Sequence, residues 1–424
     1  MPAWHSEHVP SPTDPSTDHG VGHTVRDRRP RRTIIVLGML STFGPISLDL
    51  YLPVLPELAA DLEASASSAQ LTITACLLGL AVGQLVAGPL SDQFGRRRPL
   101  LIGLVCYLLT SLACAFAPSI EVLLALRLLQ GLSGAAGLVI ARAVARDLYD
   151  GRALLIVFSR LILVSGLAPV VAPLLGGQLA RVTDWRGIFV VLAGFGLVLV
   201  VAGLVGVPES LPPERRSGGG LRDNVAGFRE LLGDRLFLGA AFSSGLAGAA
   251  MFAYIAGATF VLQRVYGMSP QGFSYVFGVN ALGIMAMSEV GARLARRWPA
   301  ERLLGAGLAM NLVGSVGVLL SALTGAGLVP LLISLWVMVS PVGLVFPSAT
   351  TIALADYPHQ AGRASSLLGL GQYIAGALVA PLVGLGGEGT AVPLGLVVVG
   401  ASLLAVLVFW QLVLRTLHGR ETST

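Results

Sequence analysis

The sequence predicts an all-α integral membrane protein whose twelve transmembrane helices form two six-helix pseudo-repeats. Three observations support this fold class. Apolar residues make up 54% of the 424 residues and charged residues only 12%, whereas about 25% of an ordinary globular domain is charged. The chain also contains twelve apolar runs of membrane-crossing length, and short motifs of the first six runs return in the last six.

Each run is long enough to cross a bilayer, because a hydrocarbon core about 30 Å thick needs about 20 apolar residues per helix. In the first half the runs predict spans over 34–56, 69–90, 99–118, 121–146, 153–179 and 186–207. In the second half they predict spans over 235–263, 271–294, 302–323, 328–353, 364–386 and 392–414. The run 235–263 is long enough to be tilted or broken.

Polar segments divide the chain into five parts. We expect a disordered N-terminal tail over 1–32, helix bundles over 33–207 and 235–415, a linker over 208–234, and a C-terminal tail over 416–424. The N-terminal tail is rich in Pro, Ser, Thr and Asp, a composition typical of disorder. Its histidines favour a solvated tail over a metal site: His5, His8, His19 and His23.

The arginines sort the loops into two classes. Clusters at 26–32, 96–98, 215–235 and 293–302 fall on one side, whereas the opposite loops hold only Arg181, Arg186 and Arg264. Cytoplasmic loops carry the excess of positive charge, so both termini and the linker are predicted to be cytoplasmic. An even number of spans also requires both termini on one side.

The halves share short motifs at matching places. Asp150-Gly151-Arg152-Ala153 precedes the fifth predicted span, and Ala361-Gly362-Arg363-Ala364 precedes the eleventh. The loop after the second span also has a partial copy, at Gly291-Ala292-Arg293-Leu294 after the eighth. This repetition indicates two similar halves on either side of the linker.

Four motifs carry a resemblance to a known family. The loop Gly88-Pro89-Leu90-Ser91-Asp92-Gln93-Phe94-Gly95-Arg96-Arg97-Arg98 resembles the loop between spans two and three of major facilitator transporters. Residues 47–53 (SLDLYLP) resemble the first span of Bcr/CflA drug-resistance transporters, and 126–131 (LRLLQG) resemble a fourth-span motif. Residues 168–177 (APVVAPLLGG) resemble the fifth-span motif of drug:proton antiporters, with Ala168 and Ala172 where that motif has glycines.

The resemblance implies the major facilitator fold, in which two halves rock around a midplane site. It further implies export of an amphiphilic drug or toxic metabolite in exchange for protons, across the bacterial plasma membrane. We expect a monomer without cofactor, metal or nucleic-acid partner. A carrier of one metabolite, such as a sugar or amino-acid derivative, is the alternative; a membrane enzyme or receptor is more remote, since no P-loop or His-Glu metal motif is present.

Asp49 and Arg127 are the candidate coupling residues. A charge inside an apolar span is costly and indicates a functional site. At about 1.5 Å per residue, both groups lie about 20 Å from the inner surface. The hypothesis is that Asp49 exchanges a proton for the arginine or for a cationic substrate; a structural ion pair is the alternative.

The Gly88–Arg98 loop is a candidate gate. Asp92 can accept hydrogen bonds at a helix N-terminus or pair with an arginine such as Arg146, while Gly88 and Gly95 permit a tight turn. We expect the loop to latch the cytoplasmic side when the path is open outward. An anchor of positive charge, made by Arg96, Arg97 and Arg98, is the alternative.

Two further groups complete the candidate site. The resemblance implies that the fifth-span motif seals the cavity against proton leak, although ordinary packing of small residues is the alternative; its residues are Gly166, Pro169, Pro173, Gly176 and Gly177. An apolar cavity with a few polar groups suits varied ligands, and its candidate lining residues are Tyr51, Gln84, Gln130, Phe252, Tyr254, Tyr275, Phe277 and Asn280.

Overall fold

The computed structural model describes residues 30–216, 229–357, 361–385, 387 and 389–417. The expected disorder of the N-terminal tail, its histidines and the glycine-rich centre of the linker therefore lie outside the described residues. Within those residues every regular element is a helix, and twelve segments are long and apolar enough to cross a membrane. The predicted all-α fold with twelve spans is confirmed.

The first half contains six spans. The first span, Arg31–Asp61, is assembled from α1 (Pro30–Leu40), α2 (Phe43–Asp49), a 3-10 turn (Leu52–Val54) and α3 (Leu55–Asp61). The next five are continuous helices: α4 (Ala66–Phe94), α5 (Arg97–Ala115), α6 (Ile120–Leu148), α7 (Gly151–Leu179) and α8 (Trp185–Gly206).

The second half repeats this number of spans. Its helices are α10 (Arg235–Phe260), α11 (Pro270–Leu294), α12 (Ala300–Thr324), α13 (Leu328–Val339), α14 (Val342–Leu354), α15 (Ala361–Gly384) and α16 (Val392–Val408), with α13 and α14 together forming one span. The run 235–263, expected to be tilted or broken, is helical without interruption as far as Phe260.

The breaks lie in spans one and ten, and prolines account for their positions. Pro53 and Pro56 stand at the starts of the 3-10 turn and α3, and Pro341 separates α13 from α14. A proline has no backbone N–H and clashes with the preceding turn, so it ends or kinks a helix. The segment Arg235–Phe260 contains no proline.

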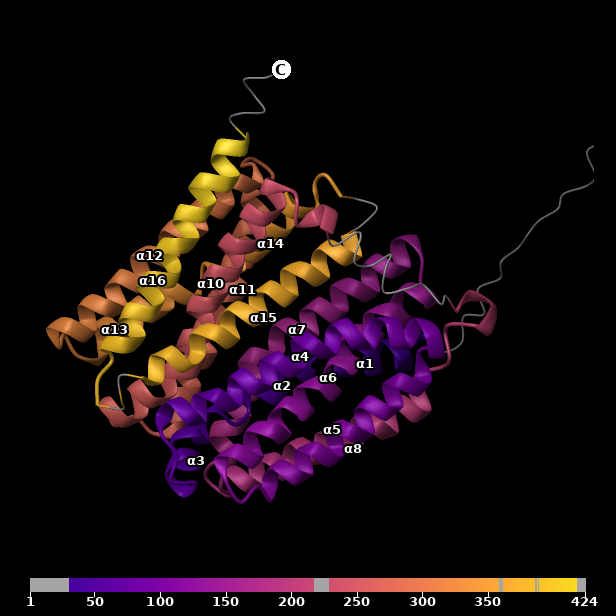
Figure 1. The fold of residues 1–424 in the computed structure, drawn as a ribbon, viewed down its shortest axis with the longest axis horizontal. Coiled ribbons are helices and arrows are strands. Elements are labelled where there is room, and N and C mark those ends of the chain that lie inside the picture. Colours follow the sequence, from indigo (N-terminus) through magenta and orange to yellow (C-terminus); the bar gives the residue numbers. More distant parts are fainter. Residues whose placement is uncertain (1–29, 217–228, 358–360, 386, 388, 418–424) are drawn as a thin grey trace, which may run out of the picture.

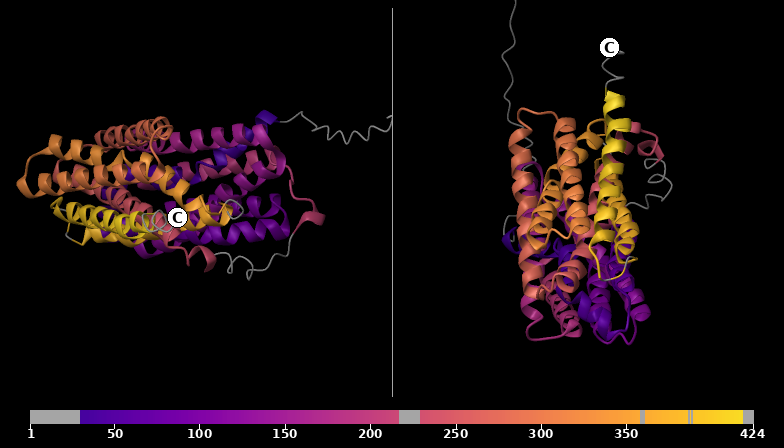
Figure 2. Two further views of the ribbon diagram at one scale, coloured as in Figure 1. Left: turned by 90° about the horizontal axis from the view of Figure 1, so that it is seen from above. Right: turned by 90° about the vertical axis from the view of Figure 1, so that its left-hand side faces the viewer.

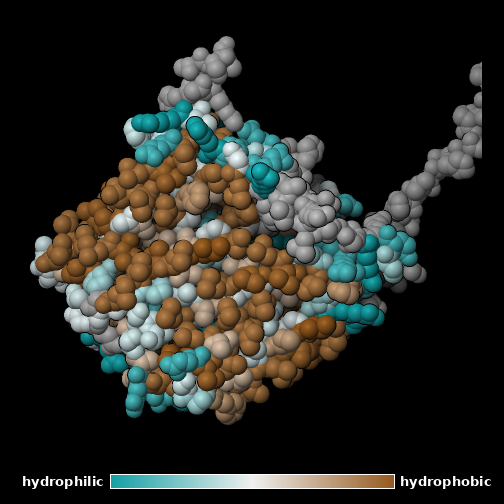
Figure 3. Space-filling model, viewed as in Figure 1, coloured by the Kyte–Doolittle hydropathy of each residue, from teal (hydrophilic) through white to brown (hydrophobic). Residues whose placement is uncertain are grey.

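The halves form two groups of helices, α1 to α8 and α10 to α16 (Figure 1). Helices of both groups run along a shared direction (Figure 2). Hydrophobic side chains cover the flanks, and hydrophilic ones gather towards the ends (Figure 3). Leu109, Leu197, Val313 and Leu404 are among the exposed apolar residues. Such a surface is suited to lipid.

The two ends of the bundle differ. We call the end with the Gly88–Arg98 loop and Glu209 the linker side, and the end with Asp61 and Ala66 the far side. Contacts between the halves join α4 to α15 and α7 to α11. Hydrogen bonds reinforce the far side: Thr259 Oγ1 donates to the Leu52 carbonyl at 2.8 Å, and Gln263 Nε2 donates to the Pro53 carbonyl at 2.9 Å. The far side is therefore closed.

Candidate functional site

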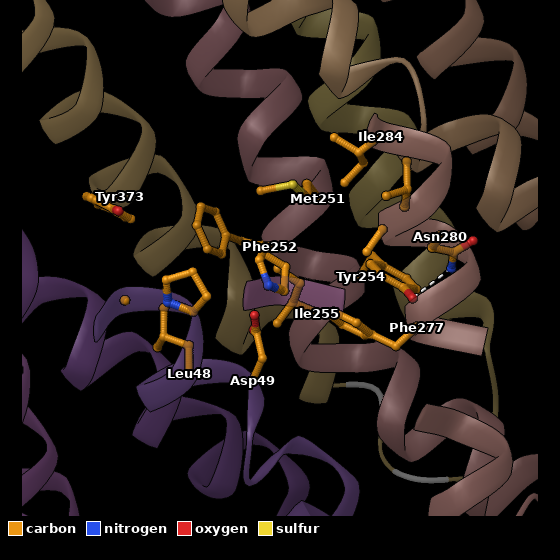
Figure 4. Close-up of a pocket in the computed structure, with 15 residues that line it drawn as sticks. Leu48, Asp49, Met251, Phe252, Tyr254, Ile255, Phe277, Asn280, Ile284 and Tyr373 are labelled. Carbon is orange, nitrogen blue, oxygen red and sulfur yellow. Dashed lines mark hydrogen bonds between the residues drawn. The ribbon is translucent and has the colours of Figure 1, made fainter. Parts of the chain in front are cut away.

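A cavity of about 160 Å³ lies between the two halves. Helices α2 and α7 line it from the first half, and α10, α11, α13 and α15 from the second. Its wall is mostly apolar or aromatic, with Asp49, Asn280 and two tyrosines as the polar exceptions: Tyr254 and Tyr373. Figure 4 shows these side chains around the cavity. A concave, apolar site with few polar groups is the usual form of a small-molecule site.

Asp49 lies at the C-terminal end of α2 and is only 5% exposed. Its carboxylate lies among the cavity residues (Figure 4). Among the described residues, no hydrogen bond or ion pair is made by this carboxylate. An acid held inside a membrane-spanning bundle without a cationic partner is expensive to ionise, so it has reason to bind a proton or a cation.

Arg127 is fully buried on α6 and belongs to a different cluster. Its Nη1 donates to the Ser47 carbonyl at 3.1 Å and to Gln130 Oε1 at 2.5 Å. Its guanidinium lies 4.4 Å from the centre of the Tyr51 ring, within the range of a cation–π contact. Arg127 therefore forms no ion pair with Asp49, and this corrects the expectation that the two side chains interact. Residues 47 and 49 point about 200° apart around a helix.

The Arg127 cluster also holds two residues expected in the cavity wall. Tyr51 is fully buried and its hydroxyl lies 2.9 Å from Thr72 Oγ1. Gln130 is fully buried and donates to Ser111 Oγ at 2.7 Å. Both side chains hold the arginine in place and neither lines the cavity. Gln84, also expected there, is half-buried on α4 and is not among the residues that line the cavity.

The expected cavity residues of the second half are mostly in place. Phe252, Tyr254, Phe277 and Asn280 line the cavity. Asn280 Nδ2 donates to the Tyr254 hydroxyl at 2.7 Å, and the Tyr254 and Phe277 rings stack with centroids 5.6 Å apart. Tyr275 instead lines a second hollow, between α11 and α13, and is 54% exposed.

Sequence reasoning missed Met251 and Tyr373 in the wall. Met251 stands next to Phe252 on α10, and Tyr373 approaches from α15 with its ring 6.2 Å from that of Phe252. An aromatic residue inside a span has no local signal that separates cavity from lipid. Only the packing of α15 beside α10 and α4 brings Tyr373 to this site.

The Gly88–Arg98 loop is centred on Arg96. Arg96 forms ion pairs with Asp92 at 2.5 Å and with Asp147 of α6 at 2.9 Å. Asp92 therefore pairs with Arg96, and the suggested partner Arg146 is replaced. Burial lowers the pKa of Arg96, but the hydrogen bonds that its guanidinium donates to Asp147 and Asp92 outweigh this and raise that pKa above its ordinary value. The three charges stabilise the turn between α4 and α5.

Glu209, which sequence reasoning missed, joins the linker to this loop. Its carboxylate accepts hydrogen bonds from the backbone N–H of Arg96 at 2.8 Å and of Arg97 at 3.2 Å, at the N-terminus of α5. Burial alone would raise the pKa of Glu209. The hydrogen bonds from the N–H groups of Leu211, Arg96 and Arg97, together with the nearby charge of Arg216, outweigh this effect and leave the pKa below its ordinary value. An acid just after the sixth span was the available signal, since helix N-termini attract carboxylates.

Glycine is required at one position of this loop for two reasons. Gly95 has φ of +86°, and a Cβ there would lie 2.9 Å from Glu209 Cδ. A Cβ on Gly88 would meet only Val139, at 3.9 Å. Of the remaining arginines, Arg97 donates to the Leu204 carbonyl at 2.7 Å and Arg98 is exposed.

The fifth-span motif occupies the far-side half of α7. Pro169 lines the cavity, while Pro173 stands one turn closer to the far side. A Cβ on Gly176 would collide with the Leu50 carbonyl, next to Asp49, and one on Gly177 would lie 2.8 Å from Ser274 Cβ of the other half. Gly166 has no neighbouring atom within 4 Å of such a Cβ. Two of the three glycines thus allow close approach.

Comparison with known proteins shows the family. The model of the Major Facilitator Superfamily matches residues 26–380. An uncharacterised MFS-type transporter, YdgK of Bacillus subtilis, is 40% identical over 89% of this chain and 94% of its own. The bicyclomycin resistance protein homolog of Haemophilus influenzae is 32% identical, covering 91% and 97%. Multidrug resistance protein D of Escherichia coli is 29% identical, covering 91% and 96%.

Solved structures show the same fold. An inward-facing, unoccupied bacterial homolog of the lysosomal transporter Spinster matches with a TM-score of 0.73 at 16% identity, covering 90% of this chain and 97% of that one. A D-xylose-proton symporter matches with a TM-score of 0.72 at 15% identity, covering 90% and 97%. The resemblance to drug-resistance transporters is thereby confirmed, and the chain belongs to the Major Facilitator Superfamily of multi-pass membrane transporters.

Proposed function

We propose that this transporter exports amphiphilic drugs or toxic metabolites across the bacterial plasma membrane in exchange for protons, by alternating access. The observation that carries the proposal is the Asp49 carboxylate, which is buried in a cavity between the halves and has no cationic partner within the part of the chain that the structure describes. The names of the bicyclomycin resistance homolog and of multidrug resistance protein D support this class of substrate.

The orientation follows from the loop arginines. Arg96, Arg97, Arg98, Arg293 and Arg297 all belong to linker-side loops, and excess positive charge marks the cytoplasmic side. The linker side is then cytoplasmic and the closed far side faces outward. We therefore propose that this conformation is inward-facing and that the cavity is loaded from the cytoplasm.

Coupling uses the Asp49 carboxylate, which is the unpaired charge among the described residues that line the cavity. In the empty cavity, a proton neutralises Asp49 and removes the cost of a buried carboxylate. A cationic amphiphile supplies the same compensation, and the rings of Phe252 and Tyr254 add favourable contact for a cation. Proton and substrate therefore compete for one carboxylate, and this competition is the requirement for exchange.

Arg127 acts on this step through the backbone of span one. It holds the Ser47 carbonyl and stacks on Tyr51, which stand two residues before and two residues after Asp49. We propose that it positions Asp49 and does not exchange protons with it. The loop centred on Arg96 is proposed to latch the linker side when the halves rock to the opposite state.

The test uses purified protein in proteoliposomes with an imposed pH gradient and ethidium as the cationic probe. Wild type is expected to transport ethidium in the direction opposite to the protons when the pH gradient is imposed. Asp49→Asn should lose this transport, because an amide takes up no proton. Asp184→Asn is the matched control, since Asp184 caps α8 outside the cavity. Undiminished gradient-driven transport by Asp49→Asn would refute the assignment.

A further inference from the structure

Span eleven contains a near copy of the fifth-span motif. Residues 171–176 of α7 read VAPLLG, and residues 379–384 of α15 read VAPLVG, so only Leu175 and Val383 differ. Both copies stand at the far-side ends of their helices. We infer that the second copy is the closing contact of the far-side gate, with Pro381 and Gly384 as its positioning residues. This inference rests on the proposed alternating access.

The two copies make different contacts. Gly176 approaches the Leu50 carbonyl within its own half. Gly384 approaches α4 of the opposite half, where a Cβ would lie 2.5 Å from Ser67 Cα and 2.6 Å from Ser67 N. The third close atom is the Gln70 side-chain oxygen Oε1, also at 2.6 Å. The Gln70 side chain could move away, but the two Ser67 atoms belong to the backbone, so an added methyl group could be accommodated only by moving the helices apart. The first copy supports the turn beside Asp49, and the second joins the two halves.

Pro381 creates the polar part of the contact. In a regular α-helix the N–H of residue 381 would donate to the carbonyl of residue 377, but a proline has no N–H. The Ala377 carbonyl is therefore free of its helical partner. Thr74 Oγ1 of the opposite half donates to this carbonyl at 3.1 Å, and Ser67 Oγ donates to the Pro381 carbonyl at 3.2 Å.

The hydrogen bonds between α15 and α4 involve no charged side chain. When the far side is closed, the freed Ala377 carbonyl is satisfied by Thr74, which is buried. When the far side opens, α15 leaves α4 and the carbonyl must bind water, because an unpaired buried carbonyl is costly. The hydrogen bond from Thr74 to the Ala377 carbonyl therefore forms when the gate closes and breaks when it opens.

The first experiment measures the state of the gate directly. Spin labels are placed on the far side at Ala60 and Thr324, and on the linker side at Gln93 and Arg297, all exposed positions, after alanine replaces Cys76, Cys106 and Cys114. Distances are measured by double electron–electron resonance in nanodiscs. Gly384→Ala is expected to lengthen the far-side distance and shorten the linker-side distance. The ratio of closed to open molecules should fall by about tenfold or more, because the tight contact is overpacked.

Gly371→Ala is the matched control on the same helix, since a Cβ on Gly371 has no atom within 4 Å. It should leave both distances unchanged. If Gly384→Ala also leaves them unchanged, the inference is overturned. The spin-label distances do not depend on transport by the Asp49→Asn variant. The inference about the gate and the proposal of proton coupling are therefore tested independently.

The second experiment tests the role of Pro381 and remains informative if Gly384→Ala is not recovered in the membrane. Thr74→Val should lengthen the far-side distance, and Thr74→Ser should restore it. Pro381→Ala returns an N–H to the Ala377 carbonyl, so Thr74→Val should then have little further effect. If the effects of Thr74→Val and Pro381→Ala on the far-side distance simply add, the inference is contradicted, because the effects of coupled residues are not additive.

Discussion

Arg127 donates a hydrogen bond to the backbone carbonyl of Ser47 at 3.1 Å, although the acid it was expected to meet lies two residues further along. The arginine thus holds the helix that carries Asp49 while its own charge faces the opposite side of that helix. Carbonyl and amide oxygens together with the Tyr51 ring surround it. This separation leaves the Asp49 carboxylate free for proton or substrate.

Replacement of Arg127 is expected to lower the stability of the folded protein and to abolish transport for that reason. Arg127→Ala leaves the Ser47 carbonyl and Gln130 Oε1 without a donor, and each buried unsatisfied group costs about 1–3 kcal/mol. The melting temperature in detergent should fall clearly and transport should be lost. Arg181→Ala, at an exposed far-side position, should change neither. A variant of normal stability that had lost only proton coupling would contradict the positioning role.

The fold could be predicted because span length and loop charge are local properties of the sequence. Twelve apolar runs and the motifs at Gly88 and Gly291 identified the spans and the two halves. The Asp49–Arg127 pair failed because counting residues gives a depth but not a direction around the helix. Asp49 faces α10 and α11 across the cavity, whereas the Ser47 carbonyl faces α6.

The cavity was predicted in part for a related reason. Phe252, Tyr254 and Asn280 lie on helices whose inner faces meet the opposite half. Tyr51 was equally plausible from its type, but its position beside a buried arginine made it part of that cluster. Tyr373 became recognisable only once α15 was placed across the bundle. Residue type therefore found polar and aromatic candidates, and packing decided among them.

Cysteine labelling tests the orientation. A cysteine at Ser65, the N-cap of α4 on the far side, should react with an impermeant maleimide in intact cells. A cysteine at exposed Gln93, at the other end of the same helix, should react only after the cells are opened. The two positions lie on one helix and so serve as mutual controls. The reverse pattern would invert the proposed orientation and make the closed side cytoplasmic.

The attachment of the linker should depend on pH through Glu209. Its pKa is lowered in the folded protein, so the ionised carboxylate stabilises the attachment above its ordinary pKa. That contribution is lost as the pH falls through the lowered value. A spin label at Ser210 should become more mobile in acid, and Glu209→Gln should remove the pH dependence while raising mobility at neutral pH. Unchanged mobility across this range would exclude the role.

Gly95 and Gly88 provide a matched test of the Gly88–Arg98 loop. Gly95→Ala places a side chain at φ of +86° and 2.9 Å from Glu209 Cδ, so it should strain the turn and displace the linker. Such backbone strain alone costs on the order of 1–3 kcal/mol. Gly88→Ala meets only Val139 at 3.9 Å and should be tolerated.

Ethidium transport in proteoliposomes, normalised to inserted protein, distinguishes the gate from a mere anchor of positive charge. Both variants keep Arg96, Arg97 and Arg98, so an anchor would leave orientation and transport unaffected in both. A gate requires the turn that lets Arg96 reach Asp92 and Asp147, so Gly95→Ala should lose most transport while Gly88→Ala keeps it. Equal activity of the two variants would leave the loop as an anchor, because the geometry set by Gly95 would then have no part in the transport cycle.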